Sequence, residues 1–539
     1  MIPAARRRAG RVTLALLLLG IALKVALSFP VHRYPADADC ALSGLCAFRV
    51  LRGELPVFFS HVRIGSLNCY LTALLFMLTG PSRAALAAGP VIVAALLLVV
   101  WHRFVRELLG RRAATVALPF MVLPAPVFAF WTYMPNGYPM TILCCGLILW
   151  LAARTVRKPD QRWAWLGFGG AIGLGWWTSL LTVGCSLPAL IWVLGSRRRL
   201  LKNPSFAFCV LGAALLGALP WILFNVRYQF PSLTMSFTTR PVEGWTALIE
   251  NLGYVLFAKL PELLVCADPT GGRVAVGGWQ RALRLPVAAG LVVAALSCLA
   301  VIVQKTGATA SREELRRRRC GWLLVFVTTT VVALNVVSEA GSVRDHAAVR
   351  YVLPLYLLVP PVLASFLLVL WRRSRPLATA VAAVILSFNL AGSYLPGTEP
   401  RRQWRQDMLA EQQLLAVLTQ AGTQVVVGPY WTVYGLNFVS RERVQALPVD
   451  RNADHYRVAQ RLKPAARWAL LAPGWDWQTM RRWLAASRLE GQAREVGPYI
   501  VVLFPTPRPA AEDPGWFLER LRQAYGTRLP FRLLTRPAP

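Results

Sequence analysis

Long apolar runs, separated by short basic segments, fill the first 395 residues of this chain. A helix that crosses a bilayer needs roughly 20 apolar residues, and eleven of these runs approach that length. The pattern therefore predicts about eleven membrane-spanning helices. The predicted spans are 12–29, 84–101, 113–131, 138–153, 163–176, 180–195, 205–224, 285–303, 321–337, 352–370 and 377–395.

The basic residues lie on alternate sides of these spans. Loops rich in Lys and Arg face the cytoplasm, so we expect a cytoplasmic N-terminus. No small-residue cleavage site follows the first apolar run, which we interpret as an uncleaved span. Because the predicted number of spans is odd, the C-terminal part is expected on the outer side. The segments assigned to the cytoplasm are 6–11, 103–112, 154–162, 197–202, 312–319 and 372–375.

Two outer loops are long enough to hold structure of their own. The first, 30–83, contains two helical segments, at 40–51 and 66–79, that are too short or too polar to cross a bilayer. The second, 225–284, contains apolar residues at helical spacing, interrupted by Glu and Lys. Such segments are typical of helices that lie in the membrane interface.

The composition changes near residue 396, where apolar β-rich runs begin to alternate with helical stretches. Alternation of this kind predicts a small α/β domain with a mainly parallel sheet. No Gly-rich phosphate loop opens its helices, so we do not expect a nucleotide site. The expected domains are therefore 1–395 in the membrane and 396–539 outside it. The strands of the C-terminal domain are expected at 424–428, 444–449, 467–473 and 498–504, and its helices at 402–420, 430–440, 455–462 and 476–487.

The totals agree with a membrane protein. The chain has 539 residues, of which 56% are hydrophobic, and its mean hydropathy is +0.47. The formal net charge of +34 comes from short Arg clusters between apolar runs, which argues against a nucleic-acid partner. The ten Cys show no metal-binding spacing. A disulfide between Cys40 and Cys46 is the one pairing we consider.

Two acidic residues that follow the first span are the first candidates for chemistry. Asp37 and Asp39 could be solvated loop carboxylates, and Asp39 could cap the helix after it. The Asp-Ala-Asp spacing also offers two hard oxygen ligands to a metal ion. A partly desolvated carboxylate could instead act as the general base for an acceptor hydroxyl. The residues alone leave these interpretations open.

Motifs in the first loop carry a family resemblance. Asp39 opens a small-residue helix that is followed by Gly53-Glu54-Leu55-Pro56-Val57-Phe58-Phe59 and by Gly65-Ser66-Leu67-Asn68. With Asn136-Gly137-Tyr138-Pro139 and Arg350-Tyr351-Val352-Leu353-Pro354, they resemble bacterial GT-C type membrane glycosyltransferases. These are relatives of the dolichyl-phosphate-mannose protein mannosyltransferases and of the lipid A aminoarabinose transferase. The chain departs from their pattern at Cys40, where an acid is expected beside Asp39, and at Asn68, which replaces an acid.

The resemblance implies a lipid-linked sugar donor and a first-loop carboxylate as general base. Either Asp39 or Asp37 would fill that role. The oxocarbenium-like transition state also needs positive charge at the departing phosphate, a task that suits the planar guanidinium of Arg. The candidates are Arg350, Arg344 and His346, with His61 and Arg63 as further ones.

Other interpretations of these residues remain open. Arg350 could extend its side chain to the interface or pair with Asp345, and His346 could be a surface histidine. Tyr351 and Tyr138 are assigned to substrate binding because they lie in the shared motifs. Tyr138 would also fit the aromatic belt expected at span ends.

The sequence as a whole predicts a polytopic α-helical membrane protein, GT-C-like, with a C-terminal α/β extracytoplasmic domain. It would sit in a bacterial inner membrane and transfer a sugar from polyprenyl phosphate to a lipid, glycan or protein acceptor. No cofactor is assigned, although Asp37 and Asp39 could bind a divalent cation. The alternatives are a transporter or flippase, which should carry paired charges within its spans, and an O-antigen ligase or polymerase.

Overall fold

The computed structural model describes residues 2–31, 38–59, 63–233, 244–265, 312–338, 346–394, 398–448, 467–473, 477–486 and 491–504. The chain divides into two compact units. The helical unit comprises Met1–Leu27, Val62–Leu67 and Pro90–Pro396. The sheet unit comprises Ser28–His61, Asn68–Gly89 and Gly397–Pro539. The division at residue 395 stays a prediction.

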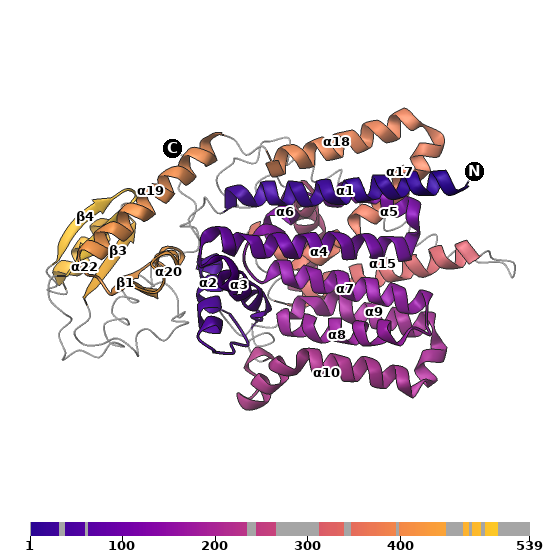
Figure 1. The fold of residues 1–539 in the computed structure, drawn as a ribbon, viewed down its shortest axis with the longest axis horizontal. Helices are drawn as coiled ribbons and strands as arrows, with labels where there is room; N and C mark the ends of the chain where they lie inside the picture. Colours follow the sequence, from indigo (N-terminus) through magenta and orange to yellow (C-terminus); the bar gives the residue numbers. More distant parts are fainter. Residues whose placement is uncertain are drawn as a thin grey trace. The chain divides into compact units, whose positions relative to one another are not determined.

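Apolar helices make up the helical unit. In Figure 1, α7, α8 and α10 run side by side, as the contacts between them require. Five helices are long and apolar enough to cross a membrane, or seven if each of two bent pairs counts as one span, within the part of the chain that the structure describes. The five are α4 (Arg83–Leu109), α7 (Tyr138–Arg157), α10 (Pro204–Arg227), α15 (Arg312–Val337) from Arg319, and α18 (Arg375–Tyr394) up to Gly392.

Three other predicted spans correspond to helices outside these five. The predicted first span, 12–29, lies in a helix of 30 residues, and the predicted spans at 163–176 and 180–195 correspond to helices of 17 and 14 residues. The span predicted at 285–303 lies outside the described residues. The expected number of eleven therefore stays a prediction. The helices concerned are α1 (Ile2–Val31), α8 (Arg162–Thr178), and α9 (Val183–Ser196), which is preceded by the 3₁₀ helix η1 (Leu180–Thr182) and followed by η2 (Arg198–Lys202).

Proline bends two segments that the hydropathy pattern predicts as single spans. The span predicted at 113–131 is two helices, α5 (Arg111–Val122) and α6 (Pro126–Tyr133), that meet at 74°. Pro124 and Pro126 cause the break, because each lacks a backbone N–H and restricts the residue before it. The span predicted at 352–370 begins as the 3₁₀ helix η4 (His346–Leu357), which meets α17 (Val359–Arg373) at 48°.

Glycines let α8 and α10 approach closely. A Cβ atom placed at Gly169 would lie 2.1 Å from the Val210 carbonyl oxygen, and one at Gly173 would lie 2.1 Å from that of Ala214. The two glycines are four residues apart on one face of α8. Such small-xxx-small patterns are how membrane helices pack without side chains between them.

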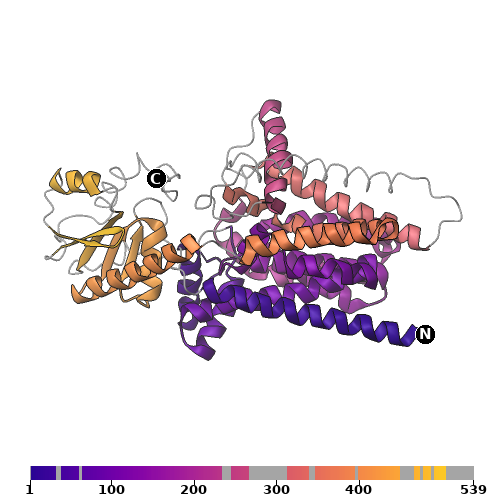
Figure 2. The same ribbon diagram turned by 90° about the horizontal axis from the view of Figure 1, so that it is seen from above.

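The helix predicted in the second outer loop is present. It consists of α12 (Trp245–Tyr254), the π-helix η3 (Val255–Lys259) and α13 (Leu260–Val265). Figure 2 shows this segment, in pink, running across the direction of the long helices. A helix in that direction fits the expected interfacial position, which stays a prediction.

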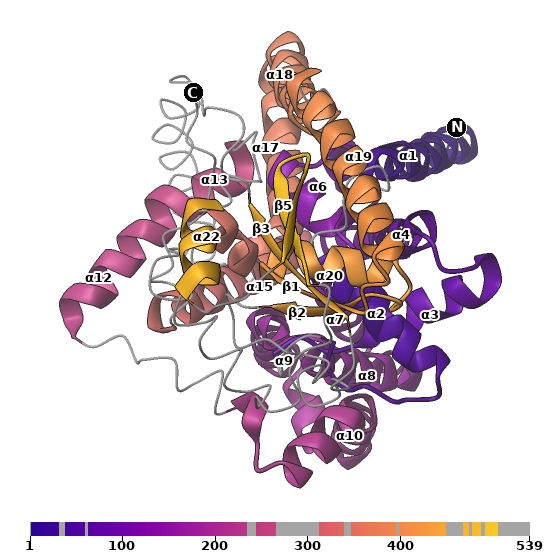
Figure 3. The ribbon, with the colours of Figure 1, turned by 90° about the vertical axis from the view of Figure 1, so that its left-hand side faces the viewer.

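A five-stranded sheet forms the core of the sheet unit, in the order β2-β1-β3-β5-β4. All four predicted strands are present, and α19, α20 and α22 surround the sheet (Figure 3). The helix predicted at 455–462 lies outside the described residues. The strands are β1 (Val425–Gly428), β2 (Gln445–Pro448), β3 (Trp468–Pro473), β4 (Gln492–Val496) and β5 (Tyr499–Leu503), and the helices are α19 (Thr398–Gln420), α20 (Tyr430–Val439) and α22 (Trp477–Ala486).

The expectation of a mainly parallel sheet was wrong. β1 pairs in parallel with β2 and β3, but β5 pairs antiparallel with both β3 and β4. A two-residue connection joins β4 to β5, and so short a link permits only antiparallel pairing. Its Gly497 has a φ of 57°, which glycine adopts readily. The sequence did not predict β4 because this edge strand is polar and mostly exposed.

The two predicted first-loop helices are α2 (Ala38–Leu51) and α3 (Leu67–Thr79). In the sheet unit, α2 packs against α20. A Cβ atom at Gly44 would lie 2.3 Å from the Phe438 ring, so the small residue is required for this contact. The rings of Phe48, Phe76 and Phe438 lie 5.5 to 6.2 Å apart and bring the three helices together. The first loop and the C-terminal part therefore share one apolar core.

Candidate functional site

Asp39 lies in the first turn of α2, where the helix N-terminus favours negative charge. The side chain is half-buried, whereas the helix that follows it is buried from Cys40 to Ala47. The hydroxyl of Tyr430, on α20, donates a hydrogen bond to Asp39 Oδ1 at 3.4 Å. Asp39 is thus a partly desolvated carboxylate that a tyrosine from the C-terminal part of the chain helps to hold.

The Gly-Glu-x-Pro motif ends α2. Gly53 has a φ of 84°, and its N–H donates to the Val50 carbonyl while the Glu54 N–H donates to that of Arg49. These two bonds form a Schellman motif, which explains why the motif begins with glycine. Glu54 then pairs with Arg49, whose Nε lies 2.6 Å from Glu54 Oε2. The acid of this motif therefore has a structural role.

The residues of the second first-loop motif make contacts within their own units. In the helical unit, the Gly65 N–H donates to the Thr178 carbonyl at 2.9 Å, and a Cβ atom at Gly65 would lie 2.0 Å from the Trp177 oxygen. In the sheet unit, Asn68 Nδ2 donates to the hydroxyl of the fully buried Ser43 at 3.0 Å. Asn68, which replaces an acid, thereby links α3 to α2.

Arg350 lies among aromatic side chains in the helical unit. Its Nη2 donates to the Tyr351 hydroxyl at 3.1 Å, and its Cζ lies 5.6 Å from the centre of the Trp131 ring. Trp131 in turn packs edge-on against Tyr138 at 5.1 Å. Three of the predicted residues, Arg350, Tyr351 and Tyr138, thus lie in one cluster. Their assigned roles stay predictions.

A second cation, Lys259, lies near the Tyr351 ring. Lys259 is fully buried, and its Nζ lies 5.9 Å from the centre of the Tyr351 ring, while the Arg350 Cζ lies 5.0 Å from the same centre. Lys259 ends the π-helix η3, and Arg350 lies in the long 3₁₀ helix η4. Irregular helices of both kinds are frequent at functional sites, because they redirect side chains from a regular helix.

Lys259 was not among the predicted site residues, and neither was Glu262, which is also buried. Both were interpreted as charges on an interfacial helix. The two residues lie three positions apart within an otherwise apolar segment, and a helix places such residues on one face. This spacing was the sequence signal that could have identified them.

Several predicted residues have no described side chain. Asp37, His61 and Arg344 lie outside the described residues, and so does the side chain of His346. Arg63 is described and exposed.

The divalent cation considered at Asp37 and Asp39 stays a prediction, because Asp37 lies outside the described residues. Among those residues, no group of three or more His, Cys, Asp or Glu side chains could hold a metal ion. Cys40 and Cys46 do not form the disulfide considered between them. Both lie within α2, six residues apart, where a helix directs them to different sides.

Comparisons with known proteins agree with this fold. The family model described as dolichyl-phosphate-mannose-protein mannosyltransferase matches residues 67–224. A crystal structure of the oligosaccharyltransferase from Archaeoglobus fulgidus, in complex with Zn and sulfate, is 12% identical, with a TM-score of 0.50. The match covers 93% of this chain and 74% of that one, and it shows a shared fold.

A second structure is similar at a lower TM-score. ArnT from Cupriavidus metallidurans, bound to undecaprenyl phosphate, is 14% identical, with a TM-score of 0.49, and the match covers 90% of this chain and 97% of that one. No curated protein sequence matches the chain. The chain is therefore similar to the protein mannosyltransferase family over residues 67–224, and it shares the fold of the Archaeoglobus fulgidus oligosaccharyltransferase.

Proposed function

We propose that this enzyme transfers a sugar from a polyprenyl-phosphate carrier to an acceptor hydroxyl. The family match supports a donor of this kind, because the matching family uses dolichyl-phosphate-mannose. The proposed position is the outer face of a bacterial inner membrane, with the N-terminus in the cytoplasm. The alternation of basic segments along the sequence supports this orientation.

The observation that carries the proposal is the pair of cations at Tyr351. Arg350 and Lys259 both lie within 6 Å of its ring centre. As the glycosidic bond breaks, negative charge develops on the departing phosphate. Cations held in place in a buried site stabilise such charge more strongly than they would in water. The two residues would therefore bind the phosphate of the donor and stabilise it as it leaves.

Asp39 is the proposed general base. In this reaction the acceptor oxygen attacks the anomeric carbon, its proton passes to the carboxylate, and the bond to the phosphate oxygen breaks. One displacement of this kind inverts the anomeric centre. Asp37 would serve as an alternative base, or would join Asp39 in binding a divalent cation. The acceptor would be a lipid, a glycan or a protein.

The test separates carrier binding from transfer in the purified full-length chain. Binding of undecaprenyl phosphate and dolichyl phosphate is measured by native mass spectrometry. Turnover is measured as release of free carrier from labelled polyprenyl-phosphate sugars, with a membrane extract as acceptor. Asp39→Asn should lower turnover by about 100-fold or more. Its affinity for the carrier should stay close to that of the wild type.

Variants of Arg350 and Lys259 should instead lose affinity for the carrier. Arg350→Ala and Lys259→Gln should each weaken carrier binding by about tenfold or more. Arg372→Ala and Lys202→Ala remove exposed charges elsewhere and serve as matched controls. Near-normal turnover in an Asp37→Asn, Asp39→Asn double variant would exclude the proposed base. Unchanged carrier binding in both cation variants would exclude the proposed phosphate site.

A further inference from the structure

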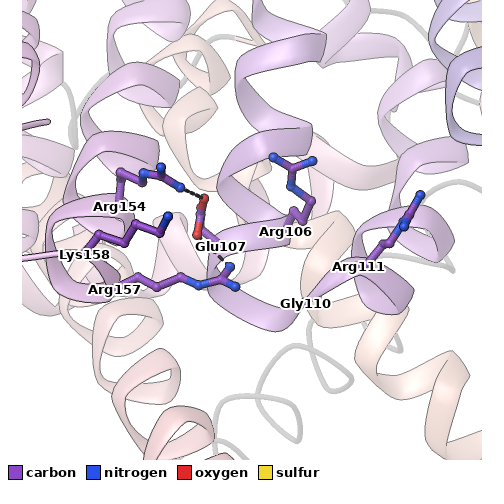
Figure 4. A pocket seen from close by; sticks show the side chains of 7 residues that line it. All are labelled: Arg106, Glu107, Gly110, Arg111, Arg154, Arg157 and Lys158. Carbon is purple, nitrogen blue, oxygen red and sulfur yellow. Dashed lines mark hydrogen bonds and ion pairs between the residues drawn. The ribbon is translucent and has the colours of Figure 1, made fainter. Parts of the chain in front are cut away.

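A cavity of about 290 Å³ lies where α4 ends, α5 begins and α7 ends. Five basic side chains and one acidic side chain line it, together with Gly110, the residue before α5. Figure 4 shows Arg154, Arg157 and Lys158 directed toward Glu107, with Arg106 and Arg111 on the other side of Glu107. The lining residues are Arg106, Glu107, Gly110, Arg111, Arg154, Arg157 and Lys158.

Glu107 holds two of the cations in place. Its side chain is 4% exposed, and its two oxygens accept hydrogen bonds from Arg154 and Arg157, each at 2.7 Å. Arg154 is fixed further by Gln161, which accepts a hydrogen bond from its Nε at 2.9 Å, and by the Trp163 ring. The single carboxylate therefore orders the arginines, and it cannot neutralise the five positive charges around the cavity.

The start of α5 adds to the positive potential. Its N-cap, Gly110, makes no side-chain cap hydrogen bond, and its first turn contains no acidic residue. Two arginines, Arg111 and Arg112, stand there instead, at the helix end that favours negative charge. A bound anion would offset both the arginines and the helix dipole.

Membrane topology alone does not require this arrangement. Orientation by positive charge depends on basic residues being present in a loop, wherever their side chains point. Here the residues come from separate helix ends and line one hollow. The cavity is also distinct from the proposed donor site, because α7 has Tyr138 at one end and Arg157 at the other, about 30 Å apart along a helix of this length.

We propose that this cavity binds a phosphate group, and that the phosphate belongs to the head group of an anionic membrane lipid. Arg side chains bind phosphate oxygens through two parallel hydrogen bonds, and Lys adds a point charge. Both α4 and α7 are apolar enough to span a membrane, so their ends would lie at the level of the lipid head groups. Basic pockets between membrane helices are known to bind such head groups.

The experiment measures lipid binding to the purified full-length chain in detergent. Native mass spectrometry compares phosphatidylglycerol with phosphatidylcholine, whose head group carries no net charge. The wild type should prefer phosphatidylglycerol by about tenfold or more. Arg106→Gln combined with Lys158→Gln should abolish that preference. Arg198→Gln combined with Arg199→Gln changes the net charge equally, outside the cavity, and should preserve it.

Two further measurements keep the proposal testable if the cavity variant folds poorly. Arg106→Lys combined with Lys158→Arg keeps both charges and should keep the preference. Inorganic phosphate at millimolar concentration should not displace phosphatidylglycerol from the wild type. If inorganic phosphate displaced phosphatidylglycerol, the cavity would be assigned to free phosphate and not to a lipid head group. Equal loss of the preference for phosphatidylglycerol in the cavity variant and the control variant would exclude the proposed lipid site. So would a wild type that shows no such preference.

Discussion

The hydroxyl of Tyr430 lies 3.4 Å from the Asp39 carboxylate, although the two residues are 391 positions apart in the sequence. The tyrosine belongs to the first turn of α20, and the aspartate to the first turn of α2. The C-terminal part of the chain thus contributes directly to the surroundings of the proposed base. Under the proposed mechanism, this contact would give the sheet unit a role in the reaction beyond its own stability.

Removing the Tyr430 hydroxyl should impair transfer with little effect on folding. A hydrogen bond to a charged group orients that group, so Tyr430→Phe should lower kcat by about threefold to tenfold. KM for the lipid-linked donor should change little. Tyr228→Phe alters an exposed tyrosine and is the control. A kcat equal to that of the wild type would show that the contact does not position Asp39.

Adding one methyl group at Gly65 should destabilise the helical unit. The new Cβ atom would lie 2.0 Å from the Trp177 carbonyl oxygen, a backbone atom that cannot move alone. Gly65→Ala should therefore cost about 1–3 kcal/mol in the free energy of unfolding. Thermal unfolding in detergent measures this effect. Gly195→Ala is the control, because nothing lies within 4 Å of its Cβ position. Equal unfolding temperatures for the two variants would contradict the packing described.

The packing of α8 on α10 can be tested by comparing substitutions at two glycines of the same helix. At Gly173 a Cβ atom would lie 2.1 Å from the Ala214 carbonyl oxygen, whereas at Gly170, three residues earlier, it would meet nothing within 4 Å. Gly173→Ala should push the helices apart and lower the unfolding temperature and the folded yield. Gly170→Ala should leave both unchanged or slightly raised, because Ala favours helix. The reverse order of stability would show that α8 presents a different face to α10.

The buried pair of Arg83 and Glu411 should make the stability of the sheet unit depend on pH. Burial raises the pKa of Glu411 above its ordinary 4.5, and the charge of Arg83 opposes part of that rise. Between 4.5 and the raised pKa the folded state binds the proton more tightly than the unfolded state does. The contribution of Glu411 to stability should therefore fall as pH rises through that window.

Substitution of Glu411 tests this dependence. Glu411→Gln cannot titrate, so its free energy of unfolding should lack the decline that the wild type shows above pH 4.5. Chemical denaturation at several pH values, followed by fluorescence, measures it. Glu495→Gln removes an exposed carboxylate on β4 and should keep the wild-type decline. A decline of the same slope in Glu411→Gln would assign it to another group.

The sequence alone determined the class of protein and most of its helices. Hydropathy and length suffice for these, because a helix in lipid must satisfy its backbone within itself and cover itself with apolar side chains. The first-loop motifs predicted a resemblance to the GT-C type. Gly53 is explained locally by its positive φ, whereas Gly65 is explained by the carbonyl of Trp177, a contact between segments far apart in the chain.

Only the tertiary structure decided how distant segments combine. No local pattern shows that Tyr430 reaches Asp39, that Lys259 and Arg350 share the Tyr351 ring, or that arginines from separate loops line one cavity. The edge strand β4 was missed for a different reason, because its residues are polar and mostly exposed. Hydropathy reports the environment of each residue, whereas side-chain partners depend on contacts between segments far apart in the chain.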